Sequence, residues 1–138
     1  MTRKEFSDKL AQLRVERGVS KYAVCKFMNR TNSQLVRIEK AEHSYSFDIA
    51  LNFLESIKCR IKLLKDKNVF NVTTSENLVD FLRGERESFS SRIQFANHIG
   101  KSVNSILKIE THQIKLTIDM FLVISEALGF TIEFEPYD

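Results

Sequence analysis

Residues 13–41, LRVERGVSKYAVCKFMNRTNSQLVRIEKA, hold two short amphipathic segments with only a few polar residues between them. Ser20 and Thr31 stand immediately before these segments, and hydroxyl side chains at such positions cap the free amides of a helix's first turn. Small or apolar side chains recur on one face of the first segment at Val24, Cys25 and Met28. The pattern predicts a helix over 21–28, a very short turn, and a third helix that begins after Thr31.

The same pattern returns 71 residues later in SSRIQFANHIGKSVNSILKIE, residues 90–110. Ser91 and Ser102 match the two caps, so helices are predicted over 92–99 and after Ser102. The pair Ile109-Glu110 answers Ile38-Glu39 at the same interval. An internal repeat of this kind predicts two units of the same architecture.

Further capping signals extend both units. The spacings Thr2-x-x-Glu5 and Thr73-x-x-Glu76 each predict a capping box that opens a first helix. Fourth helices are predicted from Ser46 and Thr117, each with an aspartate in the first turn, Asp48 and Asp119, where a negative charge stabilises the helix dipole. Each unit is therefore expected to contain four helices.

Both units end in a change of periodicity. The segments CRIKLL, residues 59–64, and FTIEFE, residues 130–135, alternate between apolar and polar residues, which is typical of half-buried strands. A weaker signal, VFNV at 69–72, predicts a short additional strand. We expect a mostly α protein with a small β component: a first unit over 1–70 and a second over 71–138, each closing with a strand.

These residues resemble the helix-turn-helix core of the phage repressor and Cro family, also called the xenobiotic-response-element (XRE) family. The resemblance covers residues 5–57 well and rests on the cap Ser20, the small Cys25 and the pair Ile38-Glu39. It implies a tandem of lambda-repressor-like units and a buried ion pair between Arg14 and Glu39. Where the family has a glutamine after the cap, this sequence has Lys21.

The second unit resembles the family more loosely. It keeps the cap Ser91, a small residue at Ala96, Gly100 in the turn and the Ile-Glu pair, but its first helix does not align cleanly. Either Arg83 or Arg86 could be the ion-pair partner of Glu110.

By position in the family motif, the first unit would read bases from the exposed start of its third helix. The expected base-reading residues are Asn32, Ser33, Gln34 and Arg37, whose amide and guanidinium groups suit adenine and guanine edges. The expected phosphate contacts are Lys21, Arg30, Thr31 and Lys40. A possible second DNA site comprises Arg92, Lys101, Val103, Asn104, Ser105 and Lys108. The alternative interpretation is a solvated polar helix face with no ligand.

Charge separates the two units. Residues 1–70 carry 15 Lys and Arg against 8 Asp and Glu, a net +7, whereas residues 71–138 carry 6 against 10, a net −4. The first unit is therefore the better ligand for a polyanion such as DNA.

The strands indicate how the units are held together. Pairing residues 59–64 with a second copy of themselves tends to set like charges against one another, whereas pairing with 130–135 sets Arg60 and Lys62 near Glu133 and Glu135. We expect this pairing within one chain, which would make the polypeptide a single-chain counterpart of a repressor dimer. Half-sites for such a pseudodimer would lie about 10 base pairs apart and need not be identical.

No catalytic motif, metal-ligand spacing or phosphate-binding loop is evident, so we expect no enzyme activity, metal or cofactor, and no small-molecule ligand. Absence of a signal-peptide pattern or a long apolar run predicts a cytoplasmic protein, on a bacterial nucleoid or phage-encoded, with reduced thiols at Cys25 and Cys59. The expected partner is double-stranded DNA, and the expected role is a transcriptional repressor. The alternative is an antitoxin or other protein-binding module, in which acidic residues of the second unit face a protein partner: Glu76, Asp80, Glu85 and Glu87.

Overall fold

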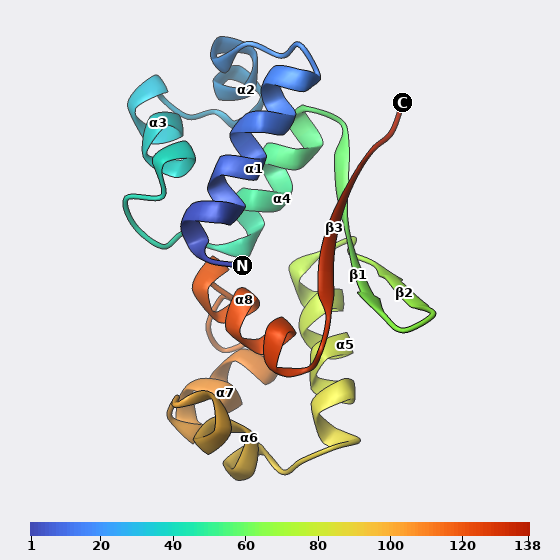
Figure 1. Cartoon of the computed structure of the whole chain (residues 1–138). Coiled ribbons are helices and arrows are strands. Elements are labelled where there is room, and N and C mark those ends of the chain that lie inside the picture. Colours follow the sequence, from blue (N-terminus) through green and yellow to red (C-terminus); the bar gives the residue numbers. More distant parts are fainter.

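The computed structural model describes residues 1–138, which form eight helices and one three-stranded antiparallel sheet (Figure 1). The protein is thus mostly α with a small β component, as predicted. The helices are α1 (Arg3–Glu16), α2 (Lys21–Met28), α3 (Asn32–Lys40), α4 (Phe47–Ser56), α5 (Ser75–Glu87), α6 (Arg92–Ile99), α7 (Val103–Glu110) and α8 (Ile118–Ala127). The strands are β1 (Cys59–Lys65), β2 (Asn68–Asn71) and β3 (Thr131–Pro136). None of the helices is long and apolar enough to cross a membrane.

Hydroxyl side chains cap seven of the helices where the sequence predicts them. The hydroxyl oxygen accepts a hydrogen bond from the backbone N–H three residues on, and the caps are Thr2, Ser20, Thr31, Ser46, Ser91, Ser102 and Thr117. Thr2 also forms the predicted capping box with Glu5. Each such cap stabilises a helix by about 1 kcal/mol, so local sequence fixes where these helices begin.

The predicted cap of α5 was wrong by one residue. Thr74, not Thr73, accepts the hydrogen bond from the Asn77 N–H, at 3.1 Å. Hydrogen bonding to strand β1 explains the shift, because the Val72 N–H still donates to the Ile61 carbonyl at 3.0 Å. Thr73 therefore follows directly on a sheet hydrogen bond, and the helix begins one residue later than the repeat interval suggests.

Left-handed residues make the turns between the second and third helices short. Asn29 ends α2 at φ 55° and Gly100 ends α6 at φ 69°. Glycine adopts this conformation without a steric penalty, and asparagine is among the residues that tolerate it best. Three residues consequently suffice to connect α2 to α3 and α6 to α7.

The sheet has the order β2-β1-β3, with all neighbours antiparallel. The predicted pairing of the two strands within one chain is confirmed: Arg60 lies opposite Glu135 and Lys62 opposite Glu133. Lys62 Nζ also lies 2.8 Å from Glu135 Oε2. The weak strand signal at 69–72 corresponds to β2, which covers the other edge of β1.

Backbone hydrogen bonds relate the two halves by an approximate two-fold axis. The Phe47 N–H donates to the Leu116 carbonyl, and the Ile118 N–H donates to the Tyr45 carbonyl, both at 2.8 Å. Adding the repeat interval of 71 to the first-half residue and subtracting it from the second-half residue converts either bond into the other. The bridge pair between these bonds, Ser46 and Thr117, consists of matching residues of the two units, so the axis passes between them.

The first helix of each half contacts the fourth helix of the other half in a symmetric way. Arg3 Nη1, at the start of α1, lies 2.9 Å from Asp119 Oδ2 in the first turn of α8. The Ser75 hydroxyl, at the start of α5, donates to Asp48 Oδ1 in the first turn of α4 at 2.5 Å. Each half therefore supplies a donor to an aspartate of the other half.

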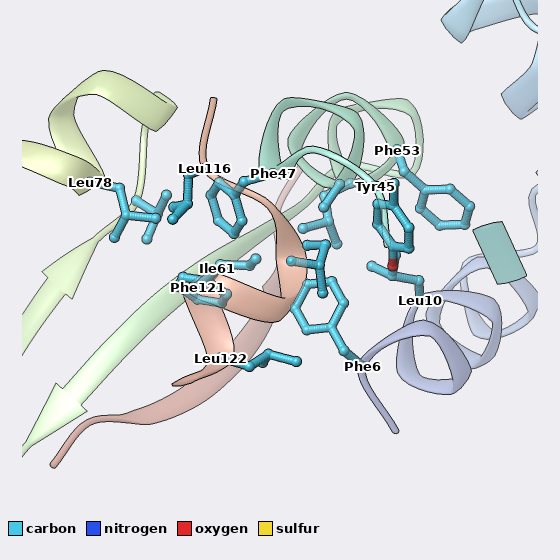
Figure 2. Close-up of a cluster of buried hydrophobic side chains, with 14 of the residues drawn as sticks. Phe6, Leu10, Tyr45, Phe47, Phe53, Ile61, Leu78, Leu116, Phe121 and Leu122 are labelled. Carbon is cyan, nitrogen blue, oxygen red and sulfur yellow. The ribbon is translucent and has the colours of Figure 1, made fainter. Parts of the chain in front are cut away.

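One continuous core of 30 buried residues contains side chains from both halves. Figure 2 shows Phe6 and Phe47 of the first half gathered with Leu116 and Phe121 of the second. The rings of Phe47 and Phe121 lie 4.5 Å apart between centroids. Burying each such side chain contributes roughly 1.5–3 kcal/mol, so the shared core fixes the two sets of four helices relative to each other.

Candidate nucleic-acid interface

The amino-terminal end of α3 presents polar side chains to solvent. Asn32, Ser33, Gln34 and Arg37 are all exposed, whereas Leu35 and Ile38 on the other face of α3 are buried. Asn32 and Ser33 make no side-chain hydrogen bond within the protein, and Arg37, 68% exposed, comes no closer than 4.0 Å to Glu42. These groups are available to a partner. The structure thus brings all four predicted base-reading residues to one exposed helix face.

Gln34 also takes part in the capping box of α3, which the sequence pattern did not predict. Its Oε1 accepts a hydrogen bond from the Thr31 N–H at 2.8 Å, while its own N–H donates to the Thr31 hydroxyl at 3.2 Å. Bidentate recognition of adenine requires both a donor and an acceptor from one amide. With Oε1 held in the capping box, Gln34 offers only its amide NH₂ group to a ligand.

Cations without an acidic partner lie before α3 in the chain and at its end. The predicted phosphate-binding residues Lys21, Arg30 and Lys40 form no ion pair, and Thr31 is exposed at the cap. Lys26 is also exposed and unpaired, and it was not among the phosphate contacts predicted from the sequence. Its position on the outer face of a predicted helix, next to a cationic turn, was the signal that could have identified it.

Two grooves flank α3, one on each side. The first lies against α2 and is lined by Tyr22, Cys25, Lys26, Asn29, Arg30, Thr31, Asn32 and Gln34. The second lies toward α4 and is lined by Arg30, Gln34, Arg37, Ile38, His43, Ser44, Tyr45 and Ile49. Arg30 and Gln34 line both. Tyr22 is 76% exposed, so an aromatic ring with a hydroxyl group stands beside these cations.

The predicted ion pair between Arg14 and Glu39 is present and holds this arrangement in place. Arg14 Nε donates to Glu39 Oε2 at 2.8 Å, and Arg14 Nη1 donates to the Val19 carbonyl at 3.1 Å. Both side chains are largely buried. One guanidinium therefore connects α1, the residue before the α2 cap, and the end of α3.

The second half repeats these contacts with Arg86. Its Nε and Nη2 donate to the two carboxylate oxygens of Glu110 at 2.9 and 2.7 Å, and its Nη1 donates to the Ser90 carbonyl at 3.1 Å. Arg83 reaches only the backbone carbonyl of Glu110, at 3.5 Å. Of the two candidates, Arg86 is thus the partner. Hydrogen bonding to Glu110 raises the pKa of Arg86 above its ordinary value.

Arg92, which the sequence placed in a possible second DNA site, forms an ion pair within the protein. Its Nε donates to Glu110 Oε1 at 2.8 Å. Burial raises the pKa of Glu110, but the hydrogen bonds from Arg86 and Arg92 outweigh burial and lower that pKa below its ordinary value. In the first half the residue that matches Arg92 is Lys21, which forms no ion pair, so Arg14 alone bonds the matching carboxylate of Glu39.

The other residues predicted for the second site lie in α7 or just before it and differ in availability. Lys101, Val103 and Asn104 are exposed, while Ser105 and Lys108 are half-buried. The Ser105 hydroxyl lies 2.8 Å from that of the cap Ser102. In Figure 1, α3 and α7 lie on the same side of the molecule, one in each half, and the sheet lies on the opposite side.

The acidic surface of the second half is partly engaged. Asp80 Oδ1 lies 2.8 Å from His112 Nε2, and Glu87 Oε1 lies 3.3 Å from Arg83 Nε. Glu76 and Glu85 have no cationic partner within the protein and remain open to a ligand.

The two cysteines are free thiols, with Cys59 buried and Cys25 partly exposed in the groove beside α2. Burial raises the pKa of the Cys59 thiol.

Comparison of the chain with protein-family models, with curated proteins and with solved structures yielded no match.

Proposed function

We propose that this protein binds double-stranded DNA in a sequence-specific manner and regulates transcription, most simply as a repressor that occupies a promoter. The observation that carries the proposal is the exposed, unpaired polar end of α3 between cations that have no acidic partner. An α-helix with its side chains matches the width of the DNA major groove. The expected setting is the cytoplasm of a bacterium, with the gene on either the host chromosome or a phage.

The side chains of α3 supply the chemistry of base reading. The free amide of Asn32 suits the N6 and N7 atoms of adenine, and the guanidinium of Arg37 suits the O6 and N7 atoms of guanine, each pair discriminating by roughly 1–3 kcal/mol. Gln34, with its oxygen in the capping box, is a single donor suited to an acceptor such as purine N7. Ser33 can bond either class of base.

The cations around α3 supply affinity and orientation. Lys21, Lys26, Arg30 and Lys40 lie beside or behind the reading face, where contacts to phosphate release counterions. The buried pair of Arg14 and Glu39 keeps α2 and α3 in a fixed relation, so that phosphate contacts and base contacts form together.

The two-fold relation of the halves supports a single-chain pseudodimer. The backbone bridge at Ser46 and Thr117 and the pairing of β1 with β3 both place matching residues opposite each other. A repressor dimer brings two DNA-binding units, here called heads, to DNA through two chains. In this protein one chain carries both heads, one in each half.

A second candidate function is binding to a protein partner, as in an antitoxin. The observation that favours it is that Glu76, which is exposed, and Glu85, which is half-buried, are unpaired in a half of net charge −4. Such a surface suits a basic partner.

Selection of binding sites from a randomised duplex pool at about 150 mM salt tests the proposed function, because non-specific charge binding weakens there. We expect Asn32→Ala and Arg37→Ala each to weaken binding to the selected site about tenfold or more. Asn68→Ala and Lys67→Ala, in the exposed β1–β2 hairpin, are matched controls and should bind normally. Failure to enrich any sequence would exclude the proposal.

A further inference from the structure

We infer that one copy of the chain occupies a non-palindromic DNA site, in which α3 anchors a dominant half-site and α7 reads a different, weaker half-site. This inference rests on the proposed function and adds the nature of the DNA target. Three features of the structure carry it: the fixed relation of the two heads, the unlike chemistry at matching positions, and the occupied edges of β1.

The relation of the two heads is fixed at two separate places on the same axis. Ser46 faces Thr117 in the backbone bridge, and Lys62 faces Glu133 in the ladder. Both pairs join matching residues of the repeat, and the shared core fills the space between the halves. Because the heads cannot separate without breaking this core, α3 and α7 are presented together to one duplex, on the same side of the molecule (Figure 1).

Matching positions of α3 and α7 have different chemistry. Val103, Asn104, Ser105 and Lys108 stand where the first half has Asn32, Ser33, Gln34 and Arg37. Val103 is 42% exposed, and an apolar side chain at this position suits the methyl group of thymine rather than a hydrogen-bonding edge. The amide moves one position along the helix, to Asn104. The two helices therefore cannot prefer the same bases.

Phosphate-binding charge is also unequal between the heads. The first half has Lys21, Lys26, Arg30 and Lys40, and the matching positions are Arg92, Asn97, Lys101 and Thr111. Arg92 is held by Glu110. Of the four positions only Lys101 offers a free cation in the second half. Affinity and salt dependence should thus come mainly from the first head, while the second head adds discrimination.

The sheet leaves no place for a second copy to pair with β1. A homodimer that repeated this arrangement with two first units would pair β1 with the β1 of the second copy. Here β2 covers one edge of β1 and β3 covers the other. The strand that a second copy would need is therefore already paired within the chain.

The experiment combines site selection with half-site replacement and measured stoichiometry. Duplexes carrying the selected site, with either half replaced by random sequence, are titrated with the wild-type chain and with Asn32→Ala and Asn104→Ala. We expect two unlike half-sites about 10 base pairs apart, bound by one chain. Asn104→Ala should weaken binding about tenfold on the intact site and have no effect once the second half-site is replaced. Asn32→Ala should weaken binding to both duplexes.

Salt dependence gives an independent readout. Lys21→Ala and Arg30→Ala should each reduce the slope of log K against log salt by about 1, since each removes one phosphate contact. Lys115→Ala, which removes an exposed cation of the loop between α7 and α8, should leave the slope unchanged.

The outcomes separate the inference from the proposed function. A perfect palindrome bound by two chains, or a single half-site with Asn104→Ala indistinguishable from wild type, would overturn the inference and leave specific DNA binding intact. No enrichment of any sequence would overturn both.

Discussion

Lys62 lies directly opposite Glu133 in the antiparallel ladder, and these residues occupy the same position in the two units of the repeat, 71 residues apart. The two-fold axis therefore passes through a pair of opposite charges. In a homodimer of identical strands the same position would set a lysine against a lysine. The charge difference between the units makes pairing within one chain favourable where self-pairing would not be.

Reversing that charge should weaken the sheet. Lys62→Glu sets a carboxylate against Glu133 and Glu135 and should lower Tm by about 3 °C at low salt. The difference from wild type should shrink in 1 M NaCl, where the Debye length is about 3 Å. Lys67→Glu in the neighbouring turn is the matched control. A Lys62→Glu protein as stable as the control at low salt would contradict this role.

Arg86 should be more important for stability than Arg83. The guanidinium of Arg86 is buried against Glu110, and removing one partner of such a pair costs about 3–5 kcal/mol because a buried charge is left behind. Because Arg92 still bonds Glu110 in Arg86→Met, we expect a loss near the lower end of that range in urea unfolding. Arg83→Met removes an exposed pair with Glu87 and a long, 3.5 Å hydrogen bond to the Glu110 carbonyl, and should cost less than about 1 kcal/mol. Equal effects of the two substitutions would be inconsistent with the geometry.

The Glu110 carboxylate should make the protein sensitive to acid. Its pKa in the folded state lies below the ordinary value of 4.5 because Arg86 and Arg92 bond the charged form. A lowered folded pKa contributes stability that is present above pH 4.5 and is lost as pH falls through the folded value. We expect the free energy of unfolding of Glu110→Gln to fall less steeply than that of wild type in this window. Parallel pH profiles of the two proteins would rule out the contribution.

Tyr45 should confer the opposite sensitivity, to alkali. Burial raises the pKa of Tyr45 to about 12, despite its 2.7 Å hydrogen bond with Ser7. A raised folded pKa means that stability is complete below the ordinary value of 10 and is lost as pH rises toward 12. The loss amounts to about 2–3 kcal/mol at 1.36 kcal/mol per pKa unit.

Tyr45→Phe should abolish that alkaline loss. At pH 7 it leaves the buried Ser7 hydroxyl without its partner, which costs about 1–3 kcal/mol, and adding Ser7→Ala should recover part of this. The second half supports the double change. Leu116 lies 71 residues after Tyr45, and Val79 lies 72 residues after Ser7 because α5 begins one residue late; both are apolar and buried. An alkaline transition that persists in Tyr45→Phe would show that another group causes it.

The cap of α5 gives a test of a single hydrogen bond. Thr74→Ala removes the acceptor for the Asn77 N–H and should destabilise the protein by about 1 kcal/mol. Thr73→Ala removes only an exposed contact with the Asn77 side chain and should have a smaller effect. Chemical denaturation of the two single variants compares them directly; a larger loss for Thr73→Ala would favour the cap predicted from the repeat.

Most helix boundaries could be predicted because they depend on residues a few positions apart. Ser20, Thr31, Ser91 and Ser102 cap the helices that their spacing predicts. The sequence could not show that Thr74 rather than Thr73 caps α5. The two threonines are adjacent, and the choice between them depends on the sheet hydrogen bond donated by Val72. That bond involves a strand distant in the chain.

The candidate site was predictable in position but not in detail. Asn32, Ser33, Gln34 and Arg37 are exposed together because a polar face at a helix start follows from periodicity. That Oε1 of Gln34 belongs to a capping box, and that Arg92 bonds Glu110, depends on rotamers and on which groups compete for one acceptor. Residue spacing carries no information about such competition.

The sequence by itself determined the two sets of four helices, every helix cap except that of α5, and the partners in the sheet, since these depend on local hydrogen bonds and on the signs of a few charges. Only the tertiary structure decided that Arg86 rather than Arg83 reaches Glu110 and that Arg92 joins them. The physical reason is geometric. One residue along a helix turns a side chain by about 100°, so the one-residue shift at Thr74 puts Arg86, and not the Glu85 that an interval of 71 from Arg14 predicts, against the carboxylate.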